Sequence, residues 1–178
     1  MHFRVVATSL LFVLVSAGTG GCGSDGGVAP KRWAQSVCIT LTPWRAEIAD
    51  LTTKAQQQLQ AAKTASQTKS NIVDLLRGAE SASEKARLGV VAAGVPDVSG
   101  GTGVSQQFIA SLSKARDAYG NAKRSVEALQ PADAKAFYTA VGSTFAVLKE
   151  EYEQSAIDPK QVGPKELQKA FNEVPECR

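Results

Sequence analysis

The chain has 178 residues and a formal net charge of +3, which is enough length for one domain with a hydrophobic core. Its longest basic clusters are adjacent pairs, so the clustered positive surface of a nucleic-acid-binding protein is not expected. Aromatic residues are few, and alanine, glutamine, lysine, glutamate and serine crowd the middle of the chain, a mixture that favours helices over strands.

Residues 1–21 have the pattern of a secretory signal peptide. Arg4 supplies a positively charged start, residues 5–15 are apolar, and residues 16–21 are small. Eleven apolar residues are too few for a stable membrane-spanning helix, which needs about 20. The sequence therefore predicts an exported protein without a permanent membrane span.

The segment Thr19-Gly20-Gly21-Cys22 resembles the lipobox of bacterial lipoproteins, and it departs from the usual pattern at Thr19, where an aliphatic residue is common. The resemblance implies that Cys22 is bonded to diacylglycerol and becomes the mature N-terminus, anchored to the extracytoplasmic side of the cell membrane. Small lipoproteins of high-GC Gram-positive bacteria are similar in their alanine-rich composition. The alternative is an ordinary cleaved signal, with Cys22 either discarded or left as a free thiol.

The remaining cysteines form an even pair if Cys22 carries lipid. In an oxidising compartment we expect a disulfide between Cys38 and Cys177, and two isolated buried thiols are the alternative. Residues 22–30 read as the lipid attachment and a flexible tether, because they are rich in glycine. Residues 31–178 then form the folded domain.

The first apolar stripe begins at Trp33 and continues to Ala62 at spacings of three and four, which is typical of an amphipathic helix. Pro43 interrupts it, since proline cannot donate to the carbonyl of Ile39. We expect either a kinked helix over 31–63 or a short helix leading into a longer one, with Thr42 as N-cap of the second.

Three further stripes follow, over residues 72–93, 108–129 and 137–152, and a short last helix is expected over 164–172. Val95-Pro96, Pro131 and Asp158-Pro159 mark the ends of the three stripes. The pattern predicts an all-α fold, an antiparallel four-helix bundle with a short C-terminal helix. In that topology the fourth helix ends beside the start of the first, so the last helix brings the two distant cysteines together.

Catalytic, cofactor-binding and metal-binding residues are not predicted. The only histidine is His2 and the only methionine is Met1, both inside the expected signal peptide. Nucleophilic triads, histidine-based zinc sites and histidine or methionine haem ligation are therefore excluded for the mature chain. Glu150, Glu151 and Glu153 are expected to form a solvated helix face rather than a metal site.

These features predict a lipid-anchored binding or scaffolding module of the cell envelope that is not an enzyme. Its expected partners are the membrane, through the lipid, and an envelope protein or cell-wall component. The alternative function is a carrier that holds a small apolar ligand between the second and third helices. A third possibility, an enzyme using carboxylates or serine and lysine, requires an inward-facing cluster of those groups.

Overall fold

The computed structural model describes residues 26–156, 158 and 161–178, which form helices joined by short connections. Cys22 and the expected signal peptide, residues 1–21, lie outside the described residues. The elements are α1 (Pro30–Ala61), α2 (Ala65–Ala92), α3 (Gly101–Ala128), α4 (Ala134–Glu153), α5 (Lys165–Glu173) and a final 3-10 turn, η1 (Pro175–Cys177).

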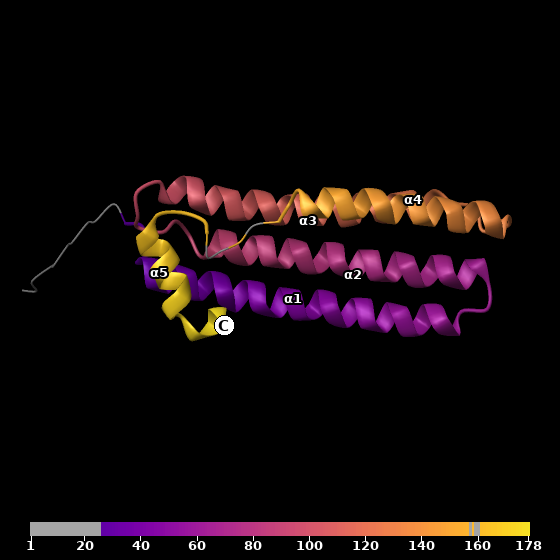
Figure 1. Cartoon of the computed structure of the whole chain (residues 1–178), viewed down its shortest axis with the longest axis horizontal. Coiled ribbons are helices and arrows are strands. Elements are labelled where there is room, and N and C mark those ends of the chain that lie inside the picture. The colour runs from indigo at the N-terminus through magenta and orange to yellow at the C-terminus, as the bar shows by residue number, and fades with distance from the viewer. Residues whose placement is uncertain (1–25, 157, 159–160) are drawn as a thin grey trace, which may run out of the picture.

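The four long helices run side by side and antiparallel, which confirms the predicted bundle (Figure 1). Helix α2 is central, because it packs against α1 on one side and α3 on the other. Helix α4 lies on α3, and α5 crosses the start of α1. We call the end of the bundle where α1 begins and α5 crosses it the α5 end, and the opposite end the far end.

Helix α1 is one continuous helix that includes Pro43, so the first of the two expected arrangements is closer to the structure. Thr42 is not an N-cap; its Oγ1 donates to the backbone oxygen of Glu176, at 3.1 Å. The β-branched residues before the proline remain helical because the buried side chains of Val37, Cys38 and Leu41 pack into the core. Tertiary burial outweighs the weak helix propensity of that stretch.

Side-chain caps and one glycine set the other helix boundaries. Thr64 accepts a hydrogen bond from the Gln67 N–H, and Asp133 accepts one from the Ala136 N–H, both at 3.1 Å. Helix α2 ends before Val95-Pro96. Gly94 has a φ of 76°, in the left-handed region, and a right-handed helix cannot continue through this conformation.

Helix α4 ends at Glu153, one residue after the end of the predicted stripe at Tyr152 and before Asp158-Pro159, as expected. It is also the shortest of the four long helices, with 20 residues against 32 in α1. Among the described residues, the backbone of α4 runs close to α3 and, over a shorter stretch, to α2, but not to α1. Tyr152 of α4 lines a small cavity together with Trp44 and Arg45 of α1.

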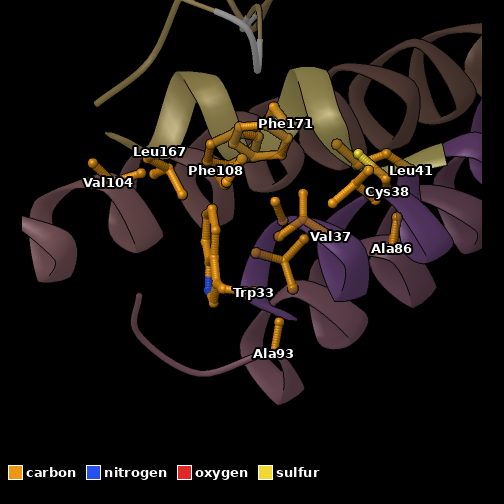
Figure 2. Packing of buried hydrophobic residues seen from close by; sticks show 14 of the residues in the cluster. Trp33, Val37, Cys38, Leu41, Ala86, Ala93, Val104, Phe108, Leu167 and Phe171 are labelled. Atoms are coloured by element: carbon orange, nitrogen blue, oxygen red, sulfur yellow. The ribbon is translucent and has the colours of Figure 1, made fainter. Parts of the chain in front are cut away.

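Two hydrophobic clusters fill the bundle. The cluster at the α5 end contains Trp33, Phe108, Leu167 and Phe171 and draws on α1, α2, α3 and α5 (Figure 2). The cluster toward the far end draws on α2, α3 and α4; its buried members are Ile72, Val73, Leu76, Ala118, Ala122, Val126 and Leu148.

Candidate functional site

The disulfide predicted between Cys38 and Cys177 is confirmed. The two Cα atoms are 5.1 Å apart across a sequence separation of 139 residues. The bond does not depend on α4 reaching the start of α1, because α5 itself lies at the α5 end, across the start of α1 (Figure 1). Helix α5 and η1 then lie directly on α1 and bring Cys177 to Cys38.

An aromatic cluster holds α5 in place beside the disulfide. The indole of Trp33 meets the rings of Phe108 and Phe171 edge-on, with centroids 5.5 and 5.9 Å apart, and the two phenyl rings stack on each other (Figure 2). Trp33 is fully buried, and its Nε1 donates to the carbonyl of Gly94 at 2.9 Å. One side chain of α1 therefore fixes both α5 and the end of α2.

Polar contacts also tie the C-terminal segment to α1. The Gln35 amide donates to the Glu176 carboxylate at 2.7 Å, and Lys31 pairs with Glu173 at 3.1 Å. Both contacts lower the carboxyl pKa: the Gln35 hydrogen bond lowers that of Glu176, and the hydrogen bond from Lys31 lowers that of Glu173.

The beginning of the described chain is bound to the same end of the bundle. The Val28 N–H donates to the Val95 carbonyl at 2.7 Å, and the Asp97 N–H donates to the Val28 carbonyl at 2.8 Å. Gly27 lies so close to Asp97 that a Cβ there would be 2.7 Å from the Asp97 Cα. The last part of the expected tether 22–30 is therefore held against the connection between α2 and α3.

Ion pairs lock α2 to α3 on the outside of the bundle. The Glu84 carboxylate accepts from Arg87 of its own helix and from Arg116 of α3, at 2.7 and 2.8 Å. The hydrogen bond from Arg87 and then that from Arg116 lower the pKa of Glu84 to about 2. Lys123 pairs with Glu80 at 2.5 Å one step farther along. The sequence did not predict these ion pairs, because the spacing of charged residues along one helix does not show which residues of a neighbouring helix lie opposite them.

Helix α4 buries only Phe137 and Leu148 within the bundle. Half of Tyr138 and 54% of Val147 are exposed. Tyr138 shares a hydrogen bond with Thr68 of α2 at 3.3 Å, while Val147 lines a groove of about 210 Å³ between α3 and α4. The groove also contains small and polar side chains: Ala118, Asn121, Ala122, Ser125, Ser143, Thr144, Leu148 and Glu151. This is an open, partly apolar surface at the outside of the bundle.

No group of three or more histidine, cysteine, aspartate or glutamate side chains suited to a metal ion occurs in the described part of the chain. Glu153, one of the three clustered glutamates of α4, pairs instead with Lys149 at 3.7 Å. Within residues 26–156, 158 and 161–178, no helix has the length and apolar character needed to span a membrane.

Comparisons of the chain with protein-family models, with curated proteins and with solved structures find no match.

Proposed function

We propose that the protein is a lipid-anchored, extracytoplasmic helical bundle that acts as a binding or scaffolding module in the cell envelope. The proposed anchor is Cys22, in the lipobox-like segment that follows the apolar residues 5–15. The observation that best supports this proposal is the position of Val28, which is hydrogen-bonded to Val95 and Asp97 at the α5 end.

The backbone contacts of Val28 limit the distance between the bundle and its anchor. Val28 lies six positions after Cys22, and a fully extended chain covers at most about 3.3–3.6 Å per residue. The α5 end is therefore held within roughly 20 Å of the lipid. A 32-residue helix is about 48 Å long, so the far end is positioned to meet partners away from the bilayer.

The exposed side of α4 is the binding surface that we propose. This helix is the most apolar of the four long ones in composition, yet it buries only two side chains within the bundle. An apolar surface next to a shallow groove suits a protein partner better than a water-soluble small molecule. The partner class is an envelope protein or a cell-wall-associated protein.

A carrier function receives less support from the geometry. The alternative requires α2 and α3 to separate around a ligand, and separation would break the pairs that Glu84 and Glu80 make with Arg116 and Lys123. It would also expose the buried side chains that α2 and α3 share, including Leu76 and Val126. Breaking part-buried ion pairs and exposing core side chains both cost free energy.

The anchor is tested by fractionating cells that produce the intact chain or its Cys22→Ala variant. We expect the intact chain in the membrane fraction and the variant in the soluble extracytoplasmic fraction. Ser24→Ala is the matched control, because it changes a neighbouring small residue without touching the thiol. The anchoring part of the proposal fails if Cys22→Ala remains with the membrane.

The binding surface is tested by placing a photo-crosslinking amino acid at Val147 of the full chain. Ile39 of α1 is the matched control, because both side chains are 54% exposed. A discrete crosslinked product from position 147, and none from position 39, is the expected result. Equal products from both positions would count against α4 as the binding surface.

A further inference from the structure

Three large apolar side chains are exposed where α2 ends. Leu88 is 52% exposed and Val91 is 46% exposed; because they lie three residues apart on the helix, they share one face. Val95 is 38% exposed in the connection that follows. We call these three residues the α2 patch. They are three of the six large hydrophobic side chains that are exposed in the described part of the chain.

Packing within the bundle does not account for the α2 patch. The buried side of the same helix contains Ala86 and Val90, which face the cluster at the α5 end. Gly89 faces α1, where a Cβ would be 2.6 Å from the Thr40 side chain. Both packed sides of this part of α2 are therefore occupied by other residues, and the patch lies outside them.

The α2 patch lies where the N-terminal part of the chain reaches the bundle. The carbonyl of Val95 accepts the hydrogen bond from Val28, so Val95 belongs both to the patch and to the attachment of the N-terminal segment. Residues 1–25 precede the described chain, and Cys22 is only six residues before Val28. A lipid on Cys22 is therefore within roughly 20 Å of the patch along the chain.

Charged side chains of both signs lie near the patch, with a small excess of basic ones. Lys85 and Arg87 occupy the preceding turn of α2, while Lys31 and Arg32 open α1 at the same end of the bundle. The acidic groups nearby are Asp97 in the connection, Glu173, which pairs with Lys31, and two glutamates that line a groove with Leu88. These are Glu84, paired with Arg87 and Arg116, and Glu80, paired with Lys123. Exposed apolar side chains beside basic ones are typical of protein surfaces that bind anionic lipid.

We propose that the α2 patch contacts an anionic lipid bilayer, with Leu88, Val91 and Val95 inserted at the boundary between headgroups and acyl chains. This inference rests on the proposed lipid anchor and goes beyond it, because the bundle is then held against the membrane in one orientation. The surface on α4 belongs to a different helix and remains available to a partner.

The size of the patch favours a bilayer over a second copy of the chain. Three half-exposed side chains amount to at most a few hundred Å² of apolar surface, whereas a stable protein interface buries about 800 Å² on each partner. A small patch is enough for binding to a bilayer, because a lipid tether on Cys22 keeps the patch at a high effective concentration near the membrane surface.

The test uses the full chain with its native lipid, reconstituted into vesicles of phosphatidylglycerol or of phosphatidylcholine. An environment-sensitive fluorophore is attached to a cysteine introduced as Leu88→Cys. Val147→Cys is the matched control, since Leu88 and Val147 are 52% and 54% exposed. Cys38 and Cys177 are bonded and Cys22 is acylated, so the new thiol alone reacts. Brominated acyl chains then report the depth of each probe.

We expect brominated lipid to quench the Leu88 probe at least about threefold more than the Val147 probe, and more strongly in phosphatidylglycerol than in phosphatidylcholine. Equal quenching at both positions overturns the inference and leaves the anchor untouched. A Leu88 signal that rises with protein concentration without vesicles assigns the patch to a second copy and also overturns it.

The anchor and the patch are separated by repeating the measurement on the Cys22→Ala chain added to vesicles. Preferential quenching at Leu88 in that variant supports the patch even if fractionation shows that Cys22 is not an anchor. In contrast, quenching that is absent at Leu88 in both the acylated and the Cys22→Ala chain overturns the patch whatever fractionation shows.

Discussion

Removal of the Cys38–Cys177 bond is expected to destabilise the bundle strongly. The variant is Cys38→Ala combined with Cys177→Ala, made in a Cys22→Ala background so that no free thiol remains. The bond joins residues 139 apart, and the chain-entropy model gives about 5 kcal/mol for a loop of that size. Measured losses for native disulfides are often smaller, so we expect a decrease of about 3 to 5 kcal/mol in the free energy of unfolding.

The assay is urea unfolding followed by circular dichroism, with the Cys22→Ala chain as reference. The free energy of unfolding falls by about 2 kcal/mol per M urea for a domain of this kind, so the urea concentration at the unfolding midpoint should fall by about 2 M. Hydrogen exchange should also show faster exchange of the α5 amides, because α5 is then held only by packing of Leu167, Ala170 and Phe171 and by its polar contacts with α1. A midpoint shift below about 0.5 M, with α5 still protected, would refute the reasoning.

Four further substitutions test the packing and the electrostatics of the bundle. Gly101→Ala should lower the free energy of unfolding by about 1 to 3 kcal/mol in urea melts, because the new Cβ overlaps the Pro96 carbonyl. Gly142→Ala, whose Cβ enters open space on helix α4, should instead raise it by about 0.5 to 1 kcal/mol; a loss at Gly142 would contradict this contrast. Trp33→Ala should cost about 3 to 5 kcal/mol by thermal unfolding, since a fully buried ring is removed, and an unchanged melting temperature would show that the aromatic cluster contributes little. For Glu84, hydrogen bonds lower the folded-state pKa from 4.5 to about 2, so its stabilising contribution is present above pH 4.5 and is lost as the pH falls toward 2. Glu84→Gln should therefore flatten the pH dependence of stability between pH 4.5 and 2, and an unaltered slope would exclude Glu84 as its source.

Most of the interior of α2 could be predicted from the spacing of its apolar residues, although the helix also buries Thr68, Val73 and Ala82 outside the predicted stripe. All seven residues of the predicted stripe are buried: Ile72, Leu76, Ala79, Ser83, Ala86, Val90 and Ala93. The prediction succeeds because α2 is the central helix, covered by α1 and α3. Periodicity identifies a face that favours burial, and a central helix has a neighbour for that face along its whole length.

The same reasoning overestimated burial in the outer helices. On α1, Ile48, Leu51 and Leu59 continue the stripe but are only half-buried, and the backbone of α4 does not run close to α1. On α4, Val141 and Phe145 are likewise half-buried. A helical stripe shows which face of a helix favours burial, but it does not show whether a neighbouring helix covers that face along its whole length.

The sequence predicts the disulfide, but it does not predict the contact of Val28 or the exposed residues at the end of α2. The pairing of Cys38 with Cys177 was predicted from the expectation that Cys22 carries lipid and that the remaining even pair lies in an oxidising compartment. The contact of Val28 with Val95 is made by backbone atoms, so no side-chain pattern signals it. The exposure of Leu88 and Val91 became visible only when the faces toward α1 and α3 were known.

The mass of the chain extracted from the membrane is the most direct test of the proposed lipid-anchored bundle. We expect a mature chain that begins at Cys22 and carries a diacylglycerol group on its sulfur, with palmitate among the fatty acids released by hydrolysis. A chain that begins at another residue, or one whose Cys22 thiol is unmodified, would contradict it.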